Sequence, residues 1–289
     1  MHHSPTLPSA RCTAIAAATL LALACASSAQ ARITNTGQLG IYPSFSGGTG
    51  PDDQVQDADG PIVLDGSATG GGNSSGSAHL EVQWGVIKAH GDSAGSLSSL
   101  ARGIFRDGLT ITAPGVTAGT LGTVTFSIVV DGTLNVCDIG LCSASWMASA
   151  EMGGSGGIHR TGTLYGGGIY APNHGYSGDA FGVYTGSETF MFGFESQLSV
   201  MLTGDAQTAY SYDGGLPTSS FAPELSLYWG GIDGVTIDGV AVTDFDVTSA
   251  SGTDYLHSTA PVPEPDGVLL MAGGLAMLGL RQRLRRGKA

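Results

Sequence analysis

Apolar and polar residues alternate over many short stretches of this chain. In His79–Lys88 the residues Leu80, Val82, Trp84 and Val86 fall on one side, and Thr123–Val130 has the same period of two. This spacing is typical of β-strands with one face in a core. We predict further strands over residues 133–136, 143–152, 158–165, 190–194, 198–202, 224–229 and 240–247.

Turn sequences separate these strands. Asp-Gly, which tolerates the positive φ angles of tight hairpins, occurs seven times between residues 32 and 260, and Asp131-Gly132 predicts a hairpin between Thr123–Val130 and Thr133–Val136. Ser96–Arg102 is the only helical candidate in the body. We therefore predict an all-β fold, an antiparallel β-sandwich or jelly roll. The Gly- and Ser-rich residues 66–78 predict a flexible loop, and residues 249–261 predict a stalk.

The first 31 residues have the features of a signal peptide. Arg11 gives a positive start, Ala14–Ala24 is apolar, and Ala29-Gln30-Ala31 fits the small-x-small cleavage pattern. We expect a secreted domain over residues 32–260. Cys25 could mark a lipoprotein site, but Ala22 stands where such a site prefers Leu.

Of four cysteines, only Cys137 and Cys142 remain after that cleavage. Because the space outside the inner membrane is oxidising, we expect them to form a disulfide. A zinc half-site is the alternative, although no second Cys or His pair stands at ligand spacing.

The chain ends in an apolar run followed by cations. Val268–Leu280 carries no charge and would extend ~20 Å as a helix, short of the ~30 Å bilayer core. Five cations in Arg281–Lys288 predict a cytoplasmic end, with the rest of the chain outside. Pro263 and Pro265 hold Glu264 in an extended segment that a processing enzyme can grip.

Val262-Pro263-Glu264-Pro265, then a short apolar run and an arginine cluster, resembles the PEP-CTERM sorting signal. The resemblance covers residues 262–289, roughly a tenth of the chain. It implies recognition by an exosortase, a membrane-embedded processing enzyme, with a transient membrane helix and cleavage near the motif. It also implies delivery to the surface or exopolysaccharide matrix of a Gram-negative bacterium.

The body between Arg32 and Ala260 is strongly acidic, with 22 Asp and Glu against five basic residues, a net charge of −17. Such a surface repels nucleic acid and anionic headgroups. It suits solubility, divalent cations or a polycationic partner.

Residues 91–95 match the G-x-S-x-G nucleophile elbow, with Ser93 as the nucleophile. Asp254 and His257 follow in triad order, so a serine esterase is one hypothesis. Glycine- and serine-rich segments at 72–76 and 153–157 match the same pattern, and no His-Gly-Gly precedes it, so we rank this hypothesis last.

Asp57 and Asp59, with Asp52 and Asp53, form an acidic cluster before Gly60 that could bind calcium, although its spacing does not fit an EF-hand. Trp84, Trp146 and Trp229 could stack on sugar rings, but their strand patterns favour core positions for Trp84 and Trp229. The histidines have no metal-binding spacing.

We therefore expect an exported, non-enzymatic surface or matrix protein that is sorted through its tail. The alternative is a carbohydrate-binding module with the same export route, which would bind exopolysaccharide.

Overall fold

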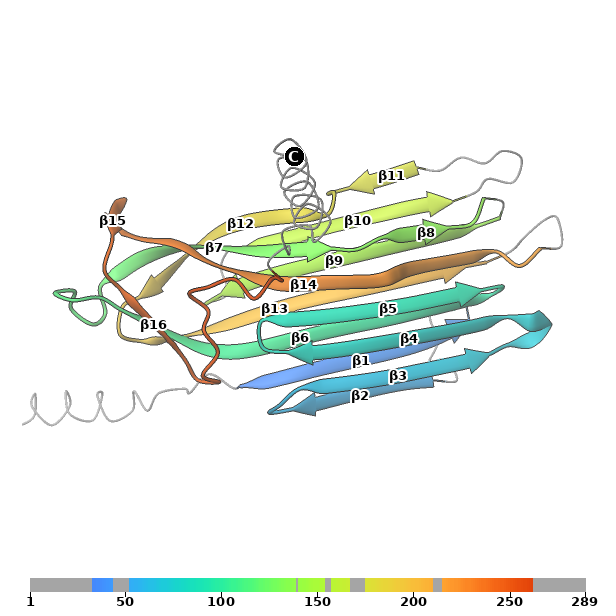
Figure 1. Ribbon diagram of the computed structural model, residues 1–289, viewed down its shortest axis with the longest axis horizontal. Coiled ribbons are helices and arrows are strands. Elements are labelled where there is room, and N and C mark those ends of the chain that lie inside the picture. The colour runs from blue at the N-terminus through green and yellow to red at the C-terminus, as the bar shows by residue number, and fades with distance from the viewer. Residues whose placement is uncertain are drawn as a thin grey trace, which may run out of the picture.

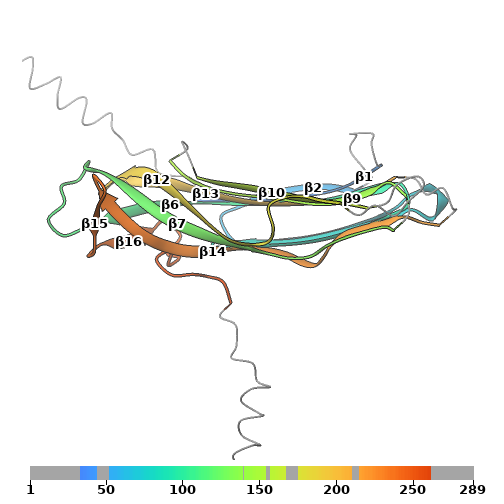
Figure 2. The same ribbon diagram turned by 90° about the horizontal axis from the view of Figure 1, so that it is seen from above.

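The computed structural model describes residues 33–43, 52–138, 140–153, 157–166, 175–209 and 215–261. Two antiparallel β-sheets pack face to face as a long, flat sandwich (Figures 1 and 2). Within these ranges the only helical element is the short 3-10 turn η1 (Gly71–Asn73). The predicted all-β antiparallel fold is confirmed, whereas the predicted signal peptide and sorting helix lie outside the described residues.

The first sheet has eight strands, in the order β11-β10-β9-β13-β6-β1-β2, with β16 paired to β6. Their bounds are β1 Thr34–Pro43, β2 Asp52–Ala58, β6 Leu97–Thr112, β9 Cys142–Met152, β10 Ile158–Gly166, β11 Gly175–Gly178, β13 Glu195–Thr208 and β16 Asp246–Ser249.

The second sheet also has eight strands, in the order β12-β7-β14-β5-β4-β3, with β8 and β15 paired to β14. Their bounds are β3 Ile62–Thr69, β4 Ser75–Gln83, β5 Val86–Ala94, β7 Leu121–Asp131, β8 Leu134–Val136, β12 Gly182–Met191, β14 Thr218–Ile237 and β15 Val240–Val242.

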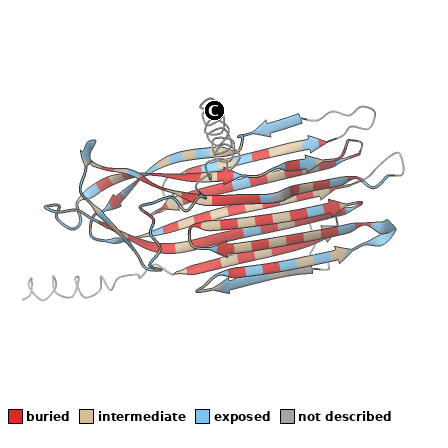
Figure 3. Cartoon of the chain, viewed as in Figure 1, coloured by how far each residue is buried: buried red, intermediate tan, exposed pale blue. Residues whose placement is uncertain are grey.

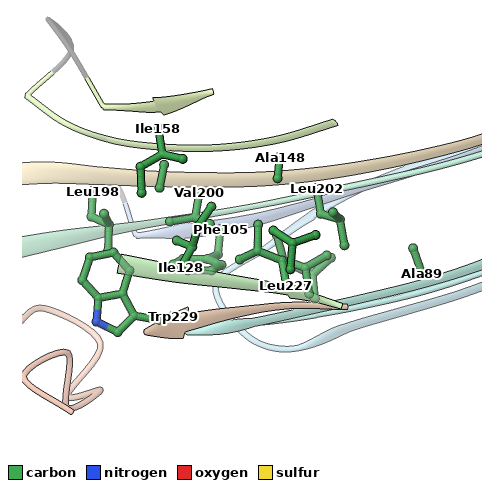
Figure 4. Packing of buried hydrophobic residues seen from close by; sticks show 14 of the residues in the cluster. Ala89, Phe105, Ile128, Ala148, Ile158, Leu198, Val200, Leu202, Leu227 and Trp229 are labelled. Carbon is green, nitrogen blue, oxygen red and sulfur yellow. The ribbon is translucent and has the colours of Figure 1, made fainter. Parts of the chain in front are cut away.

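The core lies between the sheets and follows the predicted alternation, so buried and exposed residues alternate along the central strands (Figure 3). Val200 and Leu202 of the first sheet point toward Ile128 and Leu227 of the second (Figure 4). Burying each such side chain contributes about 1.5–3 kcal/mol. The strands predicted over residues 123–130, 143–152, 158–165 and 198–202 are confirmed as parts of β7, β9, β10 and β13.

The single strand predicted over His79–Lys88 is wrong, because it is a hairpin of β4 and β5. Gln83 pairs with Val86, and Gly85 closes the turn at φ 84°. The two-residue turn changes which residues face the core: even-numbered residues point inward before it and odd-numbered residues after it. Ile87 and Ala89 are therefore buried, whereas Val86 is only partly buried.

The flexible loop predicted at residues 66–78 is wrong, since most of it belongs to the β3–β4 hairpin, which pairs Gly66 with Ala78. Small residues are needed here because the sheets approach closely. A Cβ on Gly76 would lie 2.8 Å from Ile41 Cγ2 of the facing sheet.

The helix predicted at Ser96–Arg102 is also wrong. It belongs to β6, which is hydrogen-bonded on both sides, to β1 and to β13. The tertiary pairing therefore overrides the local preference of this segment.

Asp131-Gly132 does not form the predicted hairpin. Both β7 and β8 pair with the long strand β14, β7 at Ser226–Thr236 and β8 at Ser219–Phe221, so the chain runs on past Gly132. Asp238-Gly239 is a hairpin turn, with φ angles of 49° and 80°, and it joins β14 to β15. The strand predicted at 240–247 is divided into β15 and β16.

Candidate functional site

The proposed cleavage residues Ala29 and Ala31 and the sorting residues Val262, Pro263, Glu264 and Pro265 lie outside the described residues. The structure does describe the segment that leads to the sorting motif, residues 249–261. The sequence predicts a stalk there, and this prediction is wrong: the segment packs against the left half of the sandwich in Figure 1. We call residues 251–259 the clasp.

Tyr255 fixes the middle of the clasp in the core. Its side chain is only 1% exposed, with its ring centroid 6.3 Å from that of Phe105 and 5.5 Å from that of Trp229. Trp229 Nε1 donates a 2.7 Å hydrogen bond to the Tyr255 carbonyl. The clasp therefore joins the two sheets, because Phe105 belongs to β6 and Trp229 to β14.

Asp107 holds the start of the clasp. This aspartate is fully buried in β6, and its Oδ1 accepts hydrogen bonds from the amides of Gly108 (2.8 Å) and Ser251 (3.0 Å), while its Oδ2 accepts one from the Ser251 hydroxyl. A buried carboxylate is costly unless such donors satisfy it. Sequence reasoning missed this role because it treated Asp107-Gly108 as a turn.

The Tyr255 hydroxyl lies in the same region but has no hydrogen-bond partner of good geometry among the described residues. Burial, and secondarily the nearby Asp107 carboxylate, raise the pKa of Tyr255. The ring of Tyr255, rather than its hydroxyl, is therefore the part that stabilises the clasp.

Thr259 fixes the end of the clasp. Its amide donates to the Trp229 carbonyl (2.8 Å), and its hydroxyl donates to the carbonyl of Gly85 in the β4–β5 turn (2.6 Å). Val262 follows only three residues later, a reach of about 10 Å at full extension. The proposed sorting motif therefore begins three residues beyond a fixed point on the body.

Cys137 and Cys142 form the predicted disulfide, with a Cα–Cα distance of 6.1 Å. Trp146 and Trp229 are buried, and Trp84 is partly buried against the core. Buried Trp229, and Trp146, which also stacks on Phe181 at 5.3 Å, offer no open ring face for a sugar.

The residues of the proposed esterase triad are not brought together. Ser93 is buried, donates to the Ala206 carbonyl (2.8 Å), and lies in a strand that leads into another strand, without the helix of a nucleophile elbow. Ser93 pairs with Ser219, whereas His257 lies beside Gly231, twelve residues further along β14. At the rise of a β-strand this separation is roughly 30–40 Å. His257 instead contacts exposed Asp254 at 2.8 Å.

The calcium hypothesis gains no geometric support. Asp57 accepts a 2.6 Å hydrogen bond from Thr36, and Asp59 is exposed. Within the described ranges no group of three or more His, Cys, Asp or Glu residues is arranged to hold a metal ion.

A second candidate site lies on the outer face of β3, β4 and β5, which we call the histidine face. His79 of β4 pairs directly with His90 of β5 on one side and with Asp65 of β3 on the other. His79 Nδ1 lies 2.7 Å from Asp65 and His90 Nε2 lies 2.7 Å from Asp92. This pairing was not apparent from the sequence, because a turn between the two histidines brings them together.

The histidine face is hollowed beside a bulge of β14, where the register shifts between Phe221 and Leu225. Glu224 reaches the hollow and its Oε1 lies 2.8 Å from Lys88 Nζ. The pKa of His79 lies above its ordinary value of 6.5, mainly because of its hydrogen bond to Asp65. Partial burial of the imidazole acts in the opposite direction and lowers the pKa. The face therefore becomes less negative as the pH falls.

A second hollow is lined mainly by small polar side chains: Ser75, Ser77, Asp92, Asn135, Thr218 and Ser220 are among them. Its Asp92 lies 2.7 Å from His90, which lines the first hollow. Hydroxyl, amide and carboxylate groups of this kind can bind the hydroxyl groups of a polar ligand.

None of the helical structure in the described part of the chain is long and apolar enough to cross a bilayer. No protein-family model and no curated protein matches the chain. The resemblance to a sorting signal thus depends on the residues of the tail alone.

Proposed function

We propose that the chain is an exported, non-enzymatic structural protein of the cell surface or exopolysaccharide matrix, sorted through Val262-Pro263-Glu264-Pro265. The clasp is the observation that carries this proposal. It completes the described fold just before the motif, so the hydrogen bonds that fix it at Trp229 and Gly85 lie upstream of the segment that an exosortase would cut.

The tail is suited to a temporary stay in the membrane. Its apolar run is shorter than a bilayer core, and the arginines behind it oppose translocation. Pro263 and Pro265 favour an extended motif, whose first residue, Val262, can lie at most about 10 Å from docked Thr259. Processing would therefore occur beside a folded body.

Mass and location of the mature protein test this proposal. In a host with an exosortase, we expect the wild-type chain to lose Lys288 and to reach the cell surface. Replacing Pro263, Glu264 and Pro265 with alanine is expected to leave a longer, membrane-bound product. The control, Pro261→Ala, lies just before the motif and is expected to be processed normally. Wild-type protein that keeps Lys288 and stays in the inner membrane would refute the proposal.

The second candidate function is binding of a carbohydrate at the two hollows, whose lining residues His90 and Asp92 lie 2.7 Å apart. Their hydroxyl, amide and carboxylate groups favour it. A glycan array with the body domain tests it, with Asp92→Asn as the variant and Asp131→Asn, on an exposed strand end outside both hollows, as the control. Specific binding that is lost only in Asp92→Asn supports the module, whereas no binding favours the structural role.

A further inference from the structure

The tip of the β3–β4 hairpin, residues 70–75, carries a further motif. Asn73-Ser74-Ser75 fits the Asn-x-Ser/Thr pattern of an N-glycosylation acceptor, in which the middle residue is not proline. Asn73 is the only one of the four asparagines with Ser or Thr two positions later. Because so short a pattern arises easily by chance, its structural setting decides whether it is significant. An acceptor must lie on the surface of an exported chain.

The hydrogen bonds of the tip leave the two reacting side chains of the motif exposed. The amide of Gly70 donates to the Ser74 carbonyl (2.8 Å), and the Ser74 hydroxyl donates to the Gly71 carbonyl (2.9 Å). Ser74 is only 4% exposed, whereas Asn73 and Ser75 on either side of it are exposed. Among the described residues, neither the Asn73 side-chain amide nor the Ser75 hydroxyl has a hydrogen-bond partner.

The space around Asn73 is open. A Cβ added to Gly71 or Gly72 would meet no atom within 4 Å. The tip lies at the right end of the sandwich in Figure 1, opposite the clasp, and Figure 3 shows it as exposed. A large group on Asn73 would therefore disturb neither the core nor the contacts of the clasp.

The tip can also open without disturbing the sheets. Its short turn η1 is non-helical at Gly72, where φ is 68°, and three consecutive glycines, residues 70–72, precede Asn73. Glycine adapts to many backbone conformations, and a surface turn with few hydrogen bonds opens at low cost in free energy. A transferase can therefore draw the motif into its own site while β3 and β4 stay paired.

We propose that Asn73 is the acceptor of an N-linked oligosaccharide, a modification that rests on the export of the chain proposed above. The donor is an oligosaccharide carried on a lipid diphosphate. Asn73 Nδ2 forms a bond to the anomeric carbon of the sugar, and the bond from that carbon to the diphosphate oxygen breaks. The lipid diphosphate leaves with the electron pair, and Nδ2 loses one proton to a base of the transferase. Ser75 is a positioning residue, whose hydroxyl holds the motif in the enzyme.

Mass spectrometry of the protein recovered from the native cell surface tests this proposal. We expect the peptide that contains Asn73 to be heavier than its sequence by one oligosaccharide. Asn73→Gln and Ser75→Ala are expected to lose this added mass, whereas Ser75→Thr keeps the motif and should retain it.

Asn135→Gln is the matched control and should also retain the glycan on Asn73. Asn135 is exposed, but Cys137 stands two positions after it, and the sulfur of Cys137 is bonded to Cys142 and has no proton to donate.

Two results would overturn the proposal. One is an unmodified Asn73 in protein that has reached the surface, which would leave the export proposal intact because processing of the tail is measured on a different peptide. The other is added mass that persists in Asn73→Gln, which would assign the sugar to a neighbouring serine. Protein that never leaves the cytoplasm would refute the export proposal and this one together.

Discussion

Replacing Tyr255 with alanine tests whether the clasp is part of the folded body. The ring is 1% exposed and contacts Phe105 and Trp229. Removing a buried aromatic ring costs about 3–5 kcal/mol. In a domain of this size each kcal/mol lowers Tm by roughly 2–4 °C, so we expect a loss of roughly 6–20 °C. Tyr255→Phe is expected to cost far less, because the hydroxyl that it removes makes no hydrogen bond of good geometry within the described residues.

Thermal unfolding at a fixed scan rate, followed by near-UV circular dichroism, measures both effects. His257→Ala is the control, since its side chain lies in the same segment but is 75% exposed. Exposed substitutions change stability by about 0.5 kcal/mol or less. If Tyr255→Ala changed Tm no more than His257→Ala does, residues 249–261 would be the stalk that the sequence suggested, and our account of the junction would fail.

Three further predictions concern stability and can be checked by the same unfolding measurement. Replacing Cys137 and Cys142 with serine is expected to cost about 2 kcal/mol, because the disulfide closes a short loop; an unchanged Tm would contradict this. The raised pKa of His79 means that its contribution is complete below pH 6.5 and is lost as the pH rises through that pKa. His79→Gln should therefore show a smaller fall in Tm over this range than the wild type, and equal slopes would refute the pairing with Asp65. Burial raises the pKa of Asp205 above 3.8, although a hydrogen bond from Gln207 opposes this, so Asp205→Asn should be more stable than the wild type at pH 7. That advantage should fade as the pH falls toward 3.8, and a constant advantage would point to another cause.

Alternation predicted the central strands well because their inward side chains are large and their outward ones polar. β7 and β13 are clear cases, with Phe126 and Val200 in the core. It failed for β6, where Ser98 and Ser99 are buried beside Leu97, so the strand has no clear period. It also failed for residues 66–78, whose glycine and serine are selected by the close approach of the two sheets rather than by any strand preference of their own.

The clasp could not have been predicted from local sequence. Tyr255 stands in a mostly polar stretch that has no period, and its partners lie far away in the chain. Asp107 meets Ser251 across 144 positions. The one available signal was a lone tyrosine before a proline-rich tail, which is too weak to distinguish a docked segment from a loose one.

The clasp also bears on the order of events in the proposed export route. Tyr255 and Thr259 complete the core, yet they are among the last residues before the apolar run. On the proposed route, the body could finish folding only when nearly the whole chain had crossed the membrane. By then the short apolar run would have reached the bilayer, and the arginines behind it would stop further movement. The folded body would therefore lie at the membrane surface with Val262 at most about 10 Å from Thr259, which would limit the height of the cleavage site. A loose stalk would let that height vary, whereas a docked clasp limits it. Because cleavage at the motif breaks none of the clasp's contacts, the released protein would keep the stability of the anchored one.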